Sequence, residues 1–104
     1  MSLSPVLQPD KFVHEPARLA ILTVLSACKS AEFLFLQRAT TLTKGNLSVQ
    51  LSKLEEGGLI EIRKAFEGKK PVTRAVLTGK GARALARYWA AMDELRRRGN
   101  GIAP

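Results

Sequence analysis

Apolar residues recur at spacings of three and four along much of this 104-residue chain, which is the period of a helix with one buried face. The pattern predicts helices over about 15–28, 34–40, 44–56 and 79–98. In the first helix, the residues expected to point inward are Ala17, Ala20, Ile21, Val24, Leu25 and Cys28. The segment "EFLFL" also has the composition of a strand, so we expect residues 31–33 to be extended.

After residue 59 the apolar period changes from helical to alternating. The segments "LIEIRKAF" and "PVTRAVL" have the pattern of strands, and the turn "EGKK" between them predicts an antiparallel hairpin. Pro71 has no N–H group to donate and is expected at an exposed edge. Thr43 and Thr78 are suited to cap the helices that follow them. The chain is therefore predicted to be mainly α with a small antiparallel β-hairpin, in the α+β class.

The last predicted helix, 79–98, carries two apolar stripes. One stripe contains Ala82, Leu85, Ala86, Trp89 and Met92, and the other contains Ala84, Tyr88, Ala91 and Leu95. A domain of this size covers one stripe of such a helix. We therefore expect the second stripe, Ala84, Tyr88, Ala91 and Leu95, to form the interface of a homodimer.

Charge narrows the choice of partner. The chain has 17 Lys and Arg against 9 Asp and Glu, a formal net charge of +8, which favours a polyanion such as nucleic acid or an acidic membrane. No apolar run reaches the ~20 residues that span a bilayer, and the first residues do not resemble a secretory signal. With one cysteine the chain has no internal disulfide, so we expect a cytoplasmic protein.

Residues that carry chemistry are scarce. The single histidine, His14, and the single cysteine, Cys28, have no Cys or His at metal-ligand spacing. No arrangement of nucleophile and base is evident in the sequence either. We therefore expect no metal, no cofactor and no enzymatic activity.

Small polar residues and lysines concentrate on the helix predicted over 44–56, opposite Leu47, Leu51 and Leu54. Asn and Gln side chains hydrogen-bond to adenine edges, Ser to several bases, and a valine methyl group meets a thymine methyl group. The hairpin over 63–74 is basic, with side chains suited to phosphates or the minor groove. The predicted DNA contacts are Thr43, Lys44, Asn46, Ser48, Val49, Gln50, Lys53, Lys64, Lys69, Lys70 and Arg74.

The segment "LTKGNLSVQLSKLEEGGLIEIRKAFEGKKPVTRAVLTGKGARAL" resembles winged helix-turn-helix regulators of the broad MarR/ArsR type. The matching features are the "GNLS" start of the recognition helix, its "L-x-x-L-E-x-x-G" exit, the basic wing and the "LT-x-x-G" start of the last helix. The resemblance covers 14–98, with 1–13 as an N-terminal arm and 99–104 as a flexible tail. It implies a homodimer that binds pseudo-palindromic duplex DNA, with helix 44–56 in the major groove, wing 63–74 on the backbone or minor groove, and repression as the simplest outcome.

Other functions are compatible with the same fold. A winged helix also serves as a protein–protein module, in which case the second stripe of helix 79–98 binds a different protein. An RNA-binding winged helix shares the basic wing. ArsR-type sensors hold metal with cysteine pairs or His/Asp sites, which are missing here, whereas MarR-type regulators often bind small aromatic ligands. The sequence leaves open whether there is a small-molecule effector, which genes are targeted, and whether the regulator represses or activates.

Overall fold

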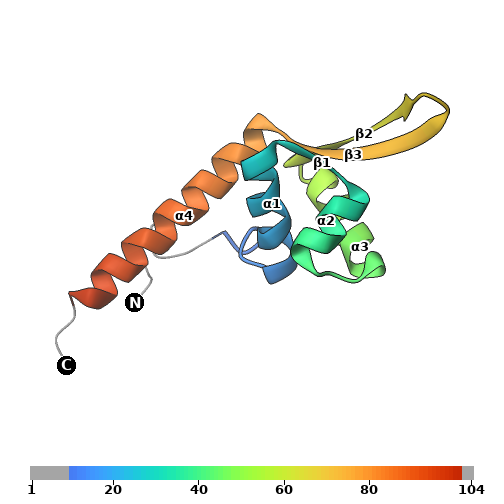
Figure 1. Ribbon diagram of the computed structural model, residues 1–104. Coiled ribbons are helices and arrows are strands. Elements are labelled where there is room, and N and C mark those ends of the chain that lie inside the picture. Colours follow the sequence, from blue (N-terminus) through green and yellow to red (C-terminus); the bar gives the residue numbers. More distant parts are fainter. Residues whose placement is uncertain (1–9, 102–104) are drawn as a thin grey trace.

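Three of the four helices in the described residues follow a residue whose side chain caps them. The computed structural model describes residues 10–101, and there the helices are α1 (Pro16–Cys28), α2 (Phe33–Thr40), α3 (Lys44–Glu56) and α4 (Gly79–Asn100) (Figure 1). The Glu15 side chain accepts hydrogen bonds from the first backbone N–H groups of α1. The predicted caps Thr43 and Thr78 are confirmed, because each accepts from the backbone N–H three residues ahead. The predicted fold class is confirmed as well.

Three antiparallel strands form one sheet with the order β1-β3-β2. They are β1 (Ser30–Glu32), β2 (Ile60–Glu67) and β3 (Lys70–Leu77). The turn between β2 and β3 is shorter than predicted, since only Gly68 and Lys69 lie outside the strands and Gly68 has φ 65°.

The short strand β1 covers only the base of the hairpin, where Ser30 pairs with Val76 and Glu32 with Arg74. Pro71 therefore lies beyond the reach of β1 and has a strand neighbour on one side only. This confirms its expected edge position. The rest of the hairpin projects freely from the body of the domain (Figure 1).

The core forms around α1, which contacts α2, α3, α4 and β3. Fully buried side chains come from each layer: Ile21, Leu22, Leu25, Leu36, Leu47, Leu54 and Ile60. Helices α1 to α3 pack on one side of the hairpin base, while α4 and the hairpin tip extend toward opposite ends (Figure 1). The position of α3 in the domain is thus determined by its own leucines, as the sequence predicts.

Three local predictions need correction. Cys28 is exposed rather than inward, because it is the last residue of α1 and lies at the end of the helix. Leu22, which was not among the residues expected inward, is completely buried. Val13 is completely buried and Phe12 packs against the core, so residues 10–13 belong to the domain rather than to an arm. Helix α4 continues to Asn100, into the predicted tail. Residues 1–9 and 102–104 of the predicted arm and tail lie outside the described residues.

The stripes of α4 are distributed differently from the prediction. Ala84 and Tyr88, expected at a dimer interface, are buried inside the protomer, with Tyr88 only 3% exposed and its hydroxyl 2.6 Å from Nδ1 of His14. Trp89, expected in the core, is 43% exposed. The reason is that α4 packs on α1 and that its buried apolar residues, Ala84, Leu85 and Tyr88, come from both stripes.

Candidate nucleic-acid interface

The open face of α3 is held outward by the burial of Leu47, Leu51 and Leu54 on its other side. Its first turn is closed by Thr43, whose Oγ1 accepts the backbone N–H of Asn46 at 3.1 Å. The exposed residues of α3 include Lys44, Asn46, Ser48, Val49, Ser52 and Lys53, and Glu55 and Glu56 are exposed at its C-terminal end. Ser52 was not predicted as a site residue, although it follows Val49 by three positions and Ser48 by four, the spacing of neighbours on one helix face.

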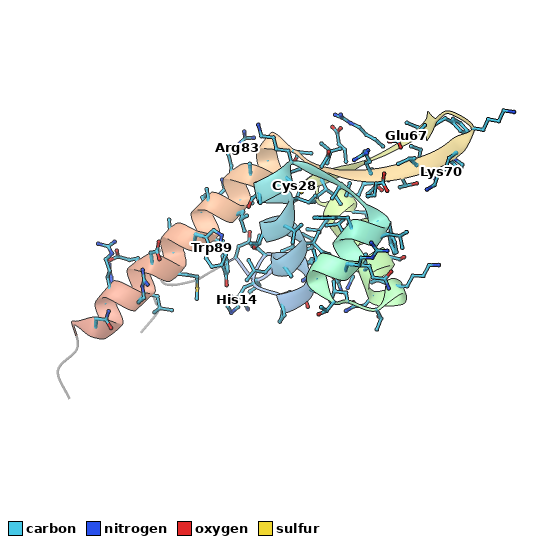
Figure 2. The ribbon with its side chains drawn as sticks, in the orientation of Figure 1. His14, Cys28, Glu67, Lys70, Arg83 and Trp89 are labelled. Atoms are coloured by element: carbon cyan, nitrogen blue, oxygen red, sulfur yellow. The ribbon has the colours of Figure 1, made fainter. Side chains whose placement is uncertain are left out.

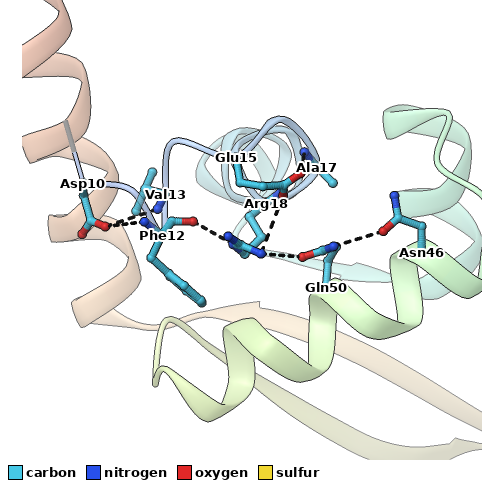
Figure 3. Close-up of polar contacts among 8 residues, drawn as sticks. All are labelled: Asp10, Phe12, Val13, Glu15, Ala17, Arg18, Asn46 and Gln50. Carbon is cyan, nitrogen blue, oxygen red and sulfur yellow. Dashed lines mark hydrogen bonds and ion pairs between the residues drawn. The ribbon is translucent and has the colours of Figure 1, made fainter.

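Gln50 does not lie on this face, contrary to the prediction. It is 8% exposed and its Oε1 accepts from Nη1 of Arg18 at 2.8 Å. Its Nε2 donates to Oδ1 of Asn46 at 3.1 Å (Figure 3). An amide is tolerated inside because both of its ends have partners, and α1 supplies one of them. The sequence alone could not show this, since Arg18 and Gln50 are 32 positions apart.

Arg18 is itself held on several sides (Figure 3). Its Nε donates to the carbonyl oxygen of Phe12 at 2.7 Å, and its guanidinium lies 4.5 Å from the centre of the Phe12 ring. Nη1 is 3.8 Å from a carboxylate oxygen of Glu15. The turn before α1 therefore fixes the arginine that contacts α3.

The Glu15 carboxylate caps α1, accepting from the backbone N–H of Ala17 at 3.1 Å and of Arg18 at 2.8 Å. Burial raises the pKa of Glu15, but the two backbone hydrogen bonds and the positive charges of Arg18 and Lys53 outweigh it, so the pKa lies below the ordinary 4.5. A carboxyl group with a depressed pKa stabilises the fold above its unfolded-state pKa and loses that contribution as the pH falls through its folded-state pKa.

We expect Glu15→Ala to lower the free energy of unfolding by about 1 kcal/mol at pH 7, the usual loss for a missing N-cap. The difference from wild type should shrink as the pH falls below the ordinary value of 4.5, because the wild-type carboxylate becomes protonated there. Urea unfolding of both proteins between pH 7 and pH 3 measures it. A difference that stays constant down to pH 3 would contradict the cap assignment.

The tip of the hairpin is the second basic surface. Lys64, Lys69 and Lys70 are exposed, and in residues 10–101 they form no ion pair. Figure 2 shows Lys70 and Glu67 near the end of the hairpin. Arg74 differs from the lysines, because its Nη2 is 3.4 Å from a carboxylate oxygen of Glu32 and 3.3 Å from one of Glu67. Its charge is therefore partly neutralised within the chain.

Residues 10–101, the described part of the chain, lack two other kinds of site. There, no three His, Cys, Asp or Glu side chains lie close enough together to hold a metal ion. Over the same residues, no helix is both long and apolar enough to cross a bilayer.

Helices α2 and α3 joined by a short turn, with a basic β-hairpin after them, define a winged helix-turn-helix protein. The chain belongs to the family described as the winged helix DNA-binding domain, whose sequence profile matches residues 17–96. This is a family of transcription regulators and not a class of enzymes.

Three relatives illustrate the membership. An uncharacterized protein of Methanocaldococcus jannaschii is 35% identical over 78 residues, covering 75% of this chain and 85% of that protein. A transcriptional regulator homologue from Pyrococcus horikoshii superimposes with a TM-score of 0.80 at 26% identity, covering 85% of this chain and 87% of the other. A MarR-family transcriptional regulator from Silicibacter pomeroyi has a TM-score of 0.66 at 25% identity, covering 90% and 63%. The resemblance to MarR-type regulators is thereby confirmed.

Proposed function

We propose that this protein is a homodimeric regulator of transcription that reads a pseudo-palindromic DNA sequence. The observation that carries the proposal is the outward face of α3, which presents small hydrogen-bonding side chains from a capped and braced helix, in a domain that also carries a basic wing. A bound dimer covers DNA that polymerase needs, so repression is the simplest outcome.

In the proposed complex α3 enters the major groove. Asn46, Ser48, Val49 and Ser52 face the bases, where their size allows close approach. Contacts to phosphates come from both elements: the cap Thr43 with Lys44 and Lys53 of α3, and Lys64, Lys69, Lys70 and Arg74 of the wing. The wing follows the backbone or the adjacent minor groove.

The proposal of a dimer rests on the exposed side chains at the projecting end of α4. Its charged side chains pair with one another along the helix, as Arg96 does with Asp93 and Arg98 does with Glu94. Its apolar side chains are covered only in part. Trp89 touches Tyr88 by an edge contact and is still 43% exposed, and Leu95 is 41% exposed. Ala91 is half-buried, and Met92 packs partly against the core. We propose that Ala91, Leu95 and Trp89 of a second copy cover this surface. Two recognition helices then reach half-sites about one helical turn apart.

An in vitro selection tests the function. The purified protein is presented with a random duplex library at two salt concentrations, and the bound sequences are determined. Recovery of an inverted repeat with half-sites about 10 base pairs apart is the expected result. Recovery of no sequence above background at the lower salt would overturn the proposal.

A separate prediction concerns the lysines of the wing. Replacing Lys69 and Lys70 together by alanine should weaken binding to all duplexes alike and lower the slope of log K against log salt by about 2 per protomer, since each lost phosphate contact removes ~0.9. The control is Arg83→Ala with Arg87→Ala, which removes the same charge from exposed positions on α4. An unchanged slope in the wing variant would exclude these lysines as phosphate contacts.

The exposed apolar surface of α4 also favours a second candidate, a module that binds a different protein through Trp89 and Leu95. A protein that remains monomeric and selects no DNA sequence would support this candidate over the first.

A further inference from the structure

We propose that Arg18, which lies away from the open face of α3, determines the hydrogen-bonding group that Asn46 offers to a DNA base. This inference rests on the proposed DNA-reading role of α3. It assigns to a residue of α1 a part in sequence preference through two successive hydrogen bonds, from Arg18 to Gln50 and from Gln50 to Asn46 (Figure 3).

The direction of these hydrogen bonds follows from the chemistry of arginine. A guanidinium group only donates hydrogen bonds, so Gln50 must turn its oxygen toward Arg18. The amide nitrogen of Gln50 then faces Asn46 and can only donate, which turns the oxygen of Asn46 toward it. The remaining group of Asn46, its Nδ2, lies on the side away from Gln50 (Figure 3).

The first donor of the series is fixed in place. The Arg18 side chain is 12% exposed and is engaged by the Phe12 carbonyl oxygen, the Phe12 ring and Glu15. Gln50 is also buried, so water does not compete for its amide group. The orientation of this amide and the direction of its two hydrogen bonds therefore stay fixed. Asn46, in the exposed first turn of α3, is the point where this arrangement reaches the surface.

The consequence concerns base preference. An unrestrained asparagine pairs with adenine by pointing both amide atoms at the base, one donating and one accepting. Here Oδ1 faces Gln50, and Nδ2 is the group left to donate. A donor fits guanine best, which presents two acceptors in the major groove, and fits cytosine worst, which presents a donor. We therefore expect Asn46 to favour guanine and reject cytosine at the base that it contacts.

The test is base preference after in vitro selection, because a purely structural role would change affinity and leave preference intact. Asn46→Ala first identifies the contacted base as the position where discrimination falls, by roughly 5- to 150-fold. In Gln50→Glu the carboxylate still accepts from Arg18 but cannot donate, so Asn46 must turn Nδ2 inward and Oδ1 outward. At that position the preference should change from guanine to cytosine or adenine, whose exocyclic amino groups donate.

Arg18 is a positioning residue. Two substitutions of Arg18 test its role without the negative charge that Gln50→Glu introduces. Arg18→Met removes the donor, so preference at the Asn46 position should relax. Arg18→Lys keeps a group that only donates and should retain the wild-type preference. This pair decides the question if Gln50→Glu does not fold, which circular dichroism shows.

The outcomes separate the two proposals. A wild-type protein that selects no sequence overturns the DNA-reading function itself. A wild-type protein that selects a sequence, while Gln50→Glu and Arg18→Met keep its preference at the Asn46 position, overturns the role of Arg18 alone. A wild-type preference for adenine at that position would also overturn it.

Discussion

If the protein is the dimer proposed above, replacing Trp89 and Leu95 together by glutamate is expected to convert it to a monomer and to weaken binding to a two-half-site duplex by about 100-fold or more. Two protomers joined in one dimer bind the second half-site as an intramolecular event, and a monomer loses that gain. Both side chains are more than two-fifths exposed in the protomer, so new charges there meet water unless a second copy covers them. Buried in an interface without partners, the same charges are strongly unfavourable.

Sedimentation gives the oligomeric state, and binding to duplexes with one or two half-sites gives the affinity. Affinity for a single half-site should be nearly unchanged, since α3 is untouched. The matched control is Trp89→Phe with Leu95→Met, which keeps apolar side chains at both positions and should remain dimeric. Persistence of the dimer in the glutamate variant would show that the interface lies elsewhere. The dimer interface proposed here omits two residues of the interface predicted from the sequence, because Ala84 and Tyr88 are already buried inside the protomer.

Gly81→Ala is expected to lower the free energy of unfolding by about 3 kcal/mol or more, at or above the upper end of the usual cost of overpacking. A Cβ atom at this position would clash with the carbonyl oxygen of Leu59 and would lie 2.8 Å from Cδ1 of Leu77. The carbonyl oxygen cannot easily move, because it accepts the backbone N–H of Thr78 at 3.1 Å. The gain in helix propensity from alanine, about 1 kcal/mol, is too small to offset the clash.

Thermal unfolding at one fixed protein concentration measures the effect, and a fall in Tm of more than about 10 °C is expected. Gly99→Ala is the matched control, since it lies in the same helix and a Cβ atom there meets nothing within 4 Å. It should leave stability unchanged or raise it by up to ~1 kcal/mol. Equal stabilities for the two variants would contradict the close contact between α4 and the base of the hairpin.

Gly81 also explains a motif. The "LT-x-x-G" pattern at the start of α4 is visible in the sequence as a resemblance, without a physical reason. In the structure Thr78 caps the helix by accepting the N–H of Gly81 at 3.0 Å and donates to the carbonyl oxygen of Gly58 at 2.7 Å. The glycine lets the helix come directly against the Leu59 backbone. The motif therefore joins the last helix to the segment that follows α3.

Much of the candidate DNA surface could be predicted from the sequence. The leucines of α3 determine its buried side, so the exposure of Lys44, Ser48, Val49 and Lys53 follows from helical geometry. Gln50 could not be placed in this way. It lies at the border of the buried side, where a polar residue is stable only if a partner satisfies it, and the partner Arg18 comes from another helix.

By itself, the sequence determined the helices, the caps Thr43 and Thr78 and the hairpin, because period, capping residues and turn residues act over a few neighbouring positions. It also determined the basic wing and the inner face of α3. Only the tertiary structure decided which side of α4 is buried, that Cys28 is exposed and that Gln50 lies between Arg18 and Asn46. The physical reason is that burial and hydrogen bonding at these residues depend on contacts between elements far apart in the chain, whereas periodicity reports only which residues share a face.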